Sequence, residues 1–267
     1  MARTIRFGVV TPLTTSVAAW RDDVRRVADL GYSTVLVPDV PEWHLAPTPM
    51  LALASAMADI TVGTWVYASP VRPAFTTAWE AHSLSVLTEG RFEFGIGTGR
   101  PNIESQLRDL GLPMGSGDRV DQVRATVAEL RRLDGPDLRT PVVMAVRGPK
   151  AQTLAAEVAD TVTFSVRPDE SGADVARIVS GFTCTRDVEL ALHVNVVGDV
   201  AAPFMGPPDT DPARMRAIQS LAVLPADPAA AIDELHRRRE ELGFTYFVIG
   251  SNSAATLAPV VATLAGR

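Results

Sequence analysis

Short runs of β-branched and aromatic residues alternate along this chain with longer segments in which apolar residues recur every three or four positions. The first pattern predicts strands and the second predicts helices, and their alternation is typical of parallel βαβ units. Eight strands are predicted, at residues 5–10, 34–37, 61–67, 92–96, 142–145, 161–164, 190–197 and 245–249. Eight units favour a closed (β/α)₈ TIM barrel of the α/β class over an open doubly wound sheet, which remains the alternative.

Two helices have clear ends in the sequence. A helix is predicted over residues 17–30, where apolar residues recur with helical spacing and Gly31 follows as a C-cap. Another is predicted over residues 227–242, with Asp227 as its N-cap and Gly243 at its end. The proline- and glycine-rich residues 203–212 predict a long loop above one face of the barrel.

Alternation within the strands assigns their faces, because the outer face of a barrel strand must be apolar to contact the helices. In the seventh predicted strand the outward residues are Leu190, Leu192, Val194 and Val196, and the inward residues are Glu189, Ala191, His193 and Asn195. In the fourth, the outward residues are Phe92, Phe94 and Ile96, and the inward residues are Glu93, Gly95 and Gly97.

Some of these inward residues are candidates for binding or chemistry. His193 is interpreted either as a hydrogen-bonded interior histidine or as a group that binds ligand or transfers a proton. Gly95 and Gly97 leave the space that a flat ring needs at the upper end of a barrel, although glycine also marks bends and bulges.

Length and composition fit one large core. A chain of 267 residues with 46% hydrophobic and 21% charged residues has the size of one eight-unit barrel, so we expect a single domain over residues 1–267. The net charge of −6 argues against a nucleic-acid surface, which needs clustered basic residues. A small-molecule substrate is therefore expected.

The cysteine content and the apolar runs of the sequence indicate in which cellular compartment the protein is expected. Cys184 is the single cysteine, so no intramolecular disulfide can form, which is compatible with a reducing environment. The first residues lack the pattern of a signal peptide, and no run of about 18 apolar residues predicts a membrane span. We expect a cytoplasmic protein with no membrane partner.

The segment after residue 142 is a candidate anion site. A strand there turns through Arg147, Gly148 and Pro149 into a helix that begins with Lys150, the single lysine of the chain. A helix N-terminus attracts phosphate through free N–H groups and its dipole, and the two cations would add charge. A strand that turns into a helix is also common in proteins that bind no anion, so the pattern alone is weak evidence for this site.

Two other patterns are rejected. The glycines of residues 95–99 are spaced too closely for a dinucleotide fingerprint, and no acidic residue follows at the required distance. His44, His82 and His236 do not have the spacing of zinc ligands, so no metal is expected.

One segment carries a family resemblance, and matches elsewhere keep the same order along the chain. The segment is Gly90-Arg91-Phe92-Glu93-Phe94-Gly95-Ile96-Gly97-Thr98-Gly99, and the other matches are residues 29–34, 62–64, 148–160 and 242–248. The segment resembles the fourth-strand signature of luciferase-like monooxygenases and F420-dependent oxidoreductases. The matches together span nearly the whole chain.

This resemblance implies a luciferase-like (β/α)₈ barrel that binds coenzyme F420, or alternatively FMN, at the carboxyl ends of its strands. The implied activity is hydride transfer between this cofactor and a small organic substrate. By position in the family, the phosphate would lie near Arg147, Gly148 and Lys150, and the ring near Val66, Ala68, Thr98 and Gly99.

Two further features are implied by the resemblance. The third strand of relatives often carries a bulge with a non-proline cis peptide, which would fall here near Trp65 and Val66. Luciferase-like barrels often dimerise, so we expect a homodimer to which Trp79 could contribute.

The chain departs from the family pattern in two places. Many members have Asp-His at the end of the second strand, where this chain has Asp39 and Val40, so His44 in the same loop is a possible substitute. The segment 134–140 is shorter than in relatives, which leaves the pocket more open or covered by residues 203–212 or a partner subunit.

The polar candidates for catalysis are Asp39, His44, His193 and Asn195. Two alternatives remain open. One is a non-catalytic flavin-binding protein, and the other is a barrel repurposed for isomerase or lyase chemistry.

Overall fold

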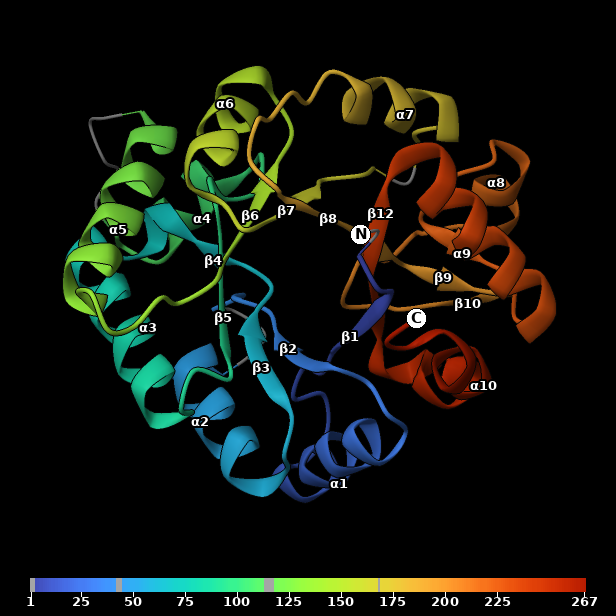
Figure 1. Cartoon of the computed structure of the whole chain (residues 1–267), viewed down its shortest axis with the longest axis horizontal. Helices are drawn as coiled ribbons and strands as arrows, with labels where there is room; N and C mark the ends of the chain where they lie inside the picture. Colours follow the sequence, from blue (N-terminus) through green and yellow to red (C-terminus); the bar gives the residue numbers. More distant parts are fainter. Residues whose placement is uncertain (1–2, 42–44, 113–117, 168) are drawn as a thin grey trace.

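The computed structural model describes residues 3–41, 45–112, 118–167 and 169–267, and it shows a closed barrel of parallel strands surrounded by helices (Figure 1). The barrel strands are β1 (Arg6–Val10), β2 (Thr34–Val37), β3 (Thr61–Thr64), β4 (Tyr67–Ala68), β5 (Phe92–Gly97), β6 (Val142–Val146), β7 (Thr161–Phe164), β8 (Glu189–Val194) and β12 (Phe244–Gly250). Their order is β3-β2-β1-β12-β8-β7-β6-β5-β4, and pairing of β3 with β5 closes the ring.

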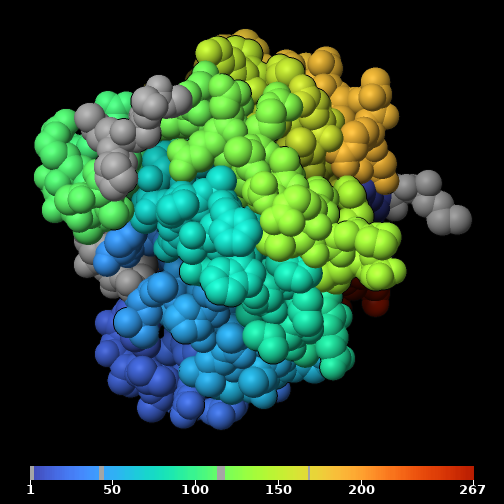
Figure 2. Space-filling view, turned by 90° about the vertical axis from the view of Figure 1, so that its left-hand side faces the viewer, coloured from blue at the N-terminus to red at the C-terminus, as the bar shows by residue number. Residues whose placement is uncertain are grey.

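Helices form the outer layer. They are α1 (Val17–Asp29), α2 (Pro47–Met57), α3 (Ala74–Leu87), α4 (Ile103–Asp109), α5 (Arg119–Asp134), α6 (Pro149–Val158), α7 (Gly172–Ser180), α8 (Pro212–Ala217), α9 (Pro228–Leu242) and α10 (Ala254–Leu264), with short 3₁₀ helices η1 (Ser69–Val71) and η2 (Ser251–Ser253). On the face shown in Figure 2, α3 lies between α2 and α5. No described helix combines the length and apolar character needed to cross a bilayer.

The eight predicted strand positions are all confirmed, and two boundaries are corrected. The third predicted strand is interrupted at Trp65 and Val66, which separate β3 from β4. The seventh ends at Val194 instead of residue 197. The reason is that the Asn195 N–H donates to the carbonyl of Ala222 at 2.9 Å, and from this residue on the chain pairs outside the barrel. The next residues form a separate sheet of β9 (Val196–Val197), β10 (Val200–Ala201) and β11 (Val223–Leu224).

The predicted helix ends are also confirmed. The Asp227 side chain accepts a hydrogen bond from the Ala230 N–H at 2.9 Å, which caps α9. Gly243 ends this helix with a φ of 78°, and Gly31 follows α1 with a φ of 82°, both in the left-handed region that glycine adopts without strain.

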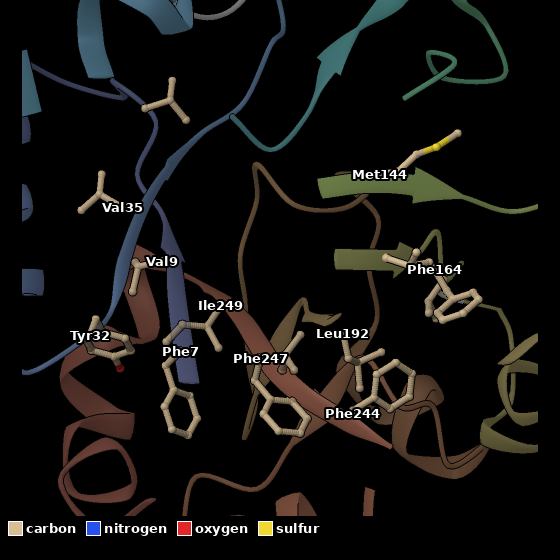
Figure 3. Packing of buried hydrophobic residues seen from close by; sticks show 14 of the residues in the cluster. Phe7, Val9, Tyr32, Val35, Met144, Phe164, Leu192, Phe244, Phe247 and Ile249 are labelled. Carbon is tan, nitrogen blue, oxygen red and sulfur yellow. The ribbon is translucent and has the colours of Figure 1, made fainter. Parts of the chain in front are cut away.

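The main hydrophobic core lies between the strands and the helices. Figure 3 shows side chains from the outer faces of β1, β8 and β12, among them Phe7, Leu192 and Phe247, which are fully buried. Burial of each such side chain contributes about 1.5–3 kcal/mol. These residues have the outward orientation that alternation predicts for Leu192.

Charged side chains fill the end of the barrel opposite the carboxyl ends of the strands, here called the floor. Arg6 Nη1 lies 2.5 Å from Glu93 Oε1, and Arg6 Nη2 lies 2.5 Å from Glu189 Oε2. The same guanidinium stacks on the ring of Tyr246 at 3.5 Å from its centroid. Burial raises the pKa of the Glu93 carboxyl, and the charge of Arg6 opposes this shift. Both glutamates point inward, as the alternation predicts.

Above this floor, the glycines of β5 make room for the bulge between β3 and β4. A Cβ atom on Gly95 would lie 1.9 Å from the Thr64 carbonyl oxygen, and one on Gly97 would lie 3.2 Å from Val66 Cγ2. The Thr64 hydroxyl donates to the Gly95 carbonyl at 2.7 Å and accepts from the Gly95 N–H at 2.8 Å. The Trp65–Val66 peptide is cis, at the position that the resemblance implies.

Gly95→Ala is expected to lower the free energy of unfolding by about 3 kcal/mol or more, because the added methyl group meets backbone that cannot move aside. Gly181→Ala is the matched control, since a Cβ there meets its neighbours at ordinary distances of 3.5 Å. Urea unfolding of both variants measures the difference. Equal stability of the two variants would contradict this account of the bulge.

Candidate functional site

A cavity of about 570 Å³ opens at the carboxyl ends of the barrel strands. Its walls come from β4 and from the segments that follow β2, β5, β6 and β7, with His193 of β8 and Met205 completing them. This volume lies in the range of small-molecule and cofactor sites. In a (β/α)₈ barrel, this is the face on which active sites lie.

The residues predicted to contact a cofactor ring are brought together on this wall. Val66, Ala68, Thr98 and Gly99 all line the cavity. A Cβ on Gly97 would lie 3.2 Å from Val66 Cγ2 and 3.3 Å from Ala145 Cβ, so the bare backbone lets these two side chains pack against β5. Val66 and Ala145 both line the cavity and give it an apolar wall against which a planar group can pack.

The mouth of the cavity is basic, although the chain as a whole carries a net charge of −6. Four arginines, Arg100, Arg119, Arg147 and Arg167, contribute to the lining, and Asp39 is the one carboxylate among the described lining residues. Guanidinium groups gathered at one cavity attract phosphate and carboxylate groups.

These arginines differ in their partners. The Arg147 guanidinium forms an ion pair with Glu170 and donates to the Ser165 carbonyl at 2.7 Å. Its charge is therefore largely balanced by Glu170. Within the ranges that the structure describes, neither Arg119 nor Arg167 forms an ion pair, although Asp118 attracts Arg119 and Glu170 attracts Arg167 at longer range. Both guanidinium groups line the cavity and can contact an anionic ligand there.

The predicted phosphate site is only partly assembled. Gly148 is the N-cap of α6 and Lys150 lies in its first turn, but neither lines the cavity. The Lys150 side chain is 79% exposed and pairs with Asp118 at 3.0 Å. Of the three predicted phosphate ligands, the structure brings Arg147 alone to the cavity.

Asp39 lies on the cavity wall with both carboxylate oxygens engaged. Arg72 Nη1 lies 2.5 Å from Oδ2 and Nη2 lies 2.7 Å from Oδ1, and the Ala68 N–H also donates to Oδ2 at 3.0 Å. The carboxylate therefore ties the end of β2 to β4 and the turn after it. Val40 beside it is buried on the same wall and carries no group that can transfer a proton.

His193 faces the cavity from β8, on the inward side that the alternation predicts. Burial lowers the pKa of its imidazole to about 4, and a hydrogen bond to the Val166 backbone partly opposes this shift. The ring is therefore neutral near pH 7.

Asn195 is buried but does not line the cavity. Its Nδ2 donates to the carbonyl of Met205 at 2.9 Å, and Met205 itself lines the cavity. Asn195 therefore anchors the segment that covers the site. The sequence left open whether the pocket is open, covered by residues 203–212 or covered by a partner subunit. The predicted loop over residues 203–212 contributes Met205 to the cavity wall.

Two other predictions concern the loops. His44 lies outside the described residues. The short segment 134–140 runs directly from α5 into β6, with Asp134 accepting from the Thr140 N–H at 2.9 Å.

Sequence reasoning missed Arg119, Arg167 and Met205 as lining residues. Arg167 comes shortly after β7, and a position just past a strand end is the signal that could have identified it. Arg119 begins a helix and Met205 lies in a long loop, so periodicity gave no signal for either.

Residues 5–197 match the model of the luciferase-like monooxygenase family. The chain belongs to this family. The match covers the bulge and most of the cavity wall, and it confirms the resemblance carried by residues 90–99. A search of curated proteins finds no match.

Solved structures of low sequence identity share the fold. A coenzyme F420 dependent tetrahydromethanopterin reductase from Methanopyrus kandleri is 13% identical with a TM-score of 0.70, over 98% of each chain. An F420-dependent secondary alcohol dehydrogenase is 15% identical with a TM-score of 0.69, over 98% of this chain and 99% of that one. The FMN-bound oxygenating constituent of 3,6-diketocamphane monooxygenase from Pseudomonas putida is 12% identical with a TM-score of 0.67, over 99% and 97%.

The pKa of His193 predicts how stability depends on pH. The unfolded chain binds a proton on this histidine at about pH 6.5, whereas the folded chain binds it at about pH 4. Stability from this residue is therefore complete above pH 6.5 and is lost as the pH falls to 4, by about 2 to 3 kcal/mol.

The expected result is a steeper loss of unfolding free energy between pH 7 and pH 4 in the wild type than in His193→Gln. Urea unfolding at several pH values measures both curves. Parallel curves would show that the folded and unfolded chains protonate this histidine alike.

Proposed function

We propose that this protein is an oxidoreductase that binds coenzyme F420 in the cavity and transfers a hydride between this cofactor and a small organic substrate. FMN is the alternative cofactor. The observation that carries the proposal is the basic mouth of a cavity beside an apolar bulge, in a member of the luciferase-like family. Neighbouring folds in two F420-dependent enzymes and one FMN-bound monooxygenase support the same class of cofactor.

The residues present fit such a group. A planar ring needs an apolar wall to pack against, and Val66 and Ala145 provide one, since both line the cavity and pack closely over Gly97. An anionic tail needs cations at the open end, and Arg119 and Arg167 lie there. Coenzyme F420 carries a phosphodiester and a glutamate tail. Arginines spread over separate segments therefore suit this long anionic tail better than they would suit a single compact phosphate.

The protein would contribute position, electrostatics and exclusion of water, while the bound cofactor supplies the ring that exchanges hydride. Val66 and Ala68 would set the depth of the ring. Met205 lines the cavity and would help to exclude water from the bound ring. Asp39 acts by position in this proposal, because Arg72 and the Ala68 N–H hold its carboxylate.

Val40 favours a second candidate, a flavin-binding protein without catalysis. It stands on the cavity wall at the position where many relatives have histidine, and it cannot transfer a proton. His193 is the neutral imidazole that remains in the described cavity. Redox catalysis in this chain would therefore either use His193 to transfer a proton or proceed without a proton-transferring side chain at that wall. For isomerase or lyase chemistry, the described residues offer no specific feature, and the support is a shared fold with a riboflavin lyase that is 11% identical with a TM-score of 0.73, over 99% of this chain and 93% of that one.

Association into a homodimer stays a prediction. The outer surface of α3 exposes Phe75, Trp79, Val86 and Leu87, and the rings of Phe75 and Trp79 stack at 6.3 Å. These residues lie on the helix between α2 and α5, on the face shown in Figure 2. A second copy would cover this apolar surface.

Titration of the purified protein with F420, FMN and FAD tests the proposal. We expect F420 to bind most tightly, because its tail reaches more of the arginines at the mouth. Fluorescence of the cofactors and calorimetry measure the affinities. Binding without ring reduction by any donor in rapid-mixing assays would favour the non-catalytic candidate, and no binding to any of the three would overturn both.

Arg119→Ala and Arg167→Ala are each expected to weaken cofactor binding by about 1 to 3 kcal/mol, a roughly 5- to 150-fold rise in Kd. Lys150→Ala is the control, since its side chain is exposed and outside the cavity. Calorimetry at one fixed salt concentration compares the three. A larger effect of Lys150→Ala than of either arginine variant would show that the anion site lies at the start of α6 instead.

A further inference from the structure

The side chain of Trp65 reaches across the interior of the barrel. The residue lies in the bulge between β3 and β4, where its N–H donates to the Val37 carbonyl at 2.9 Å. Its indole meets the ring of Tyr246 edge to face, with 6.1 Å between the ring centroids. Tyr246 belongs to β12, which is separated from β3 by β2 and β1. The indole therefore spans part of the space that the strands enclose.

Trp65 separates the cavity from an apolar cluster inside the barrel. On one side the indole lines the cavity. On the other side it packs against a small cluster of buried residues, which are Val10, Leu36, Ala191, Tyr246 and Val248. Phe204 and Met205 pack against the same cluster, but they come from the loop that follows β10. Trp65 is therefore the part of this layer that the barrel itself supplies.

The ring on which Trp65 packs is held in place. The Arg6 guanidinium stacks on the ring of Tyr246 at 3.5 Å from its centroid, and two glutamates of the floor hold this guanidinium by ion pairs. Tyr246 also lies close to the backbone of β1, since a Cβ on Gly8 would lie 2.5 Å from its hydroxyl oxygen. A space left by a truncated side chain persists where its surroundings cannot collapse. Space vacated at residue 65 is therefore expected to stay open.

The indole of Trp65 makes no hydrogen bond within the part of the chain that the structure describes. By contrast, the indole N–H of Trp20 donates to the Thr11 carbonyl at 2.9 Å. Truncation of Trp65 therefore leaves no buried acceptor without its partner, which is the costly outcome of many such substitutions. Trp65 acts by the space that it fills.

We propose that Trp65 determines the size of the substrate that the cavity accepts, because its indole limits how deep the cavity extends into the barrel. This inference rests on the proposed function, since it concerns the substrate of the same cavity. Val66 packs over Gly97 on the wall assigned to the cofactor ring, whereas Trp65 extends away from that wall toward β12. A substrate beside a ring on this wall would therefore meet Trp65, and a small residue at position 65 would admit a substrate longer by one aromatic ring.

Indole is a suitable probe, because it matches the side chain that Trp65→Ala removes. We expect Trp65→Ala to bind indole about tenfold or more tightly than the wild type does, since the variant offers an apolar space that the wild type fills. Calorimetry on the full chain measures both affinities. Trp65→Leu, with benzene as its probe, is the second variant, because it leaves a smaller space and perturbs the barrel less.

Trp20→Ala is the matched control, since it also removes an indole but at a place remote from the cavity. Trp20 is 3% exposed and packs in the core between α1 and the strands. The fluorescence of bound F420 locates the probe. Indole is expected to change this fluorescence in Trp65→Ala, where it enters the cavity beside the ring, and to leave it unchanged in Trp20→Ala and in the wild type. The affinity of Trp65→Ala for F420 is expected to be the same with and without indole.

Three results would overturn the inference and leave the cofactor proposal standing. The first is equal affinity of the wild type and both Trp65 variants for their probes. The second is indole binding to Trp65→Ala that leaves F420 fluorescence unchanged, because the probe would then lie outside the cavity. The third is competition between indole and F420, because the vacated space would then belong to the cofactor ring.

Failure of the proposed function gives a different result. Tight binding of indole by Trp65→Ala, in a protein that binds neither F420 nor FMN, would overturn the cofactor proposal. It would still support Trp65 as the residue that limits the depth of the cavity.

Discussion

The site depends on close contact between two backbone segments inside the barrel. The bulge between β3 and β4 directs the Thr64 carbonyl and the Val66 side chain inward, and β5 tolerates them because it has glycine at residues 95 and 97. The Thr64 hydroxyl makes two hydrogen bonds with Gly95, which fixes the bulge to its neighbour. Val66, which the bulge turns inward, forms part of the cavity wall.

Charge is divided between the two ends of the barrel. At the floor, Arg6 is enclosed by Glu93, Glu189 and Tyr246, so its charge is compensated within the protein. At the mouth, Arg119 and Arg167 form no ion pair within the described residues and feel only the longer-range attraction of Asp118 and Glu170, respectively. The floor therefore serves the closure of the barrel, and the mouth is suited to an external anion. This division explains how an acidic protein can present a basic site.

The sequence allowed the barrel and the faces of its fourth and seventh predicted strands to be predicted, because burial imposes a period of two that can be recognised locally. It also allowed the wall formed by Val66, Thr98 and Gly99 to be predicted through the family resemblance. Contacts between distant segments could not be predicted in this way. The pairing of Asp39 with Arg72, and of Arg147 with Glu170, depends on where loops meet in space. Those pairings decide which charges remain for a ligand.

The attachment of the cover has a consequence for how this site can change. Asn195 holds the segment through the main-chain oxygen of Met205, and the side chains of Phe204 and Met205 pack against a small apolar cluster inside the barrel. The main-chain hydrogen bond does not depend on the identity of these two side chains, whereas their packing does. A substitution at either residue therefore alters the shape of the site and the attachment of the loop together.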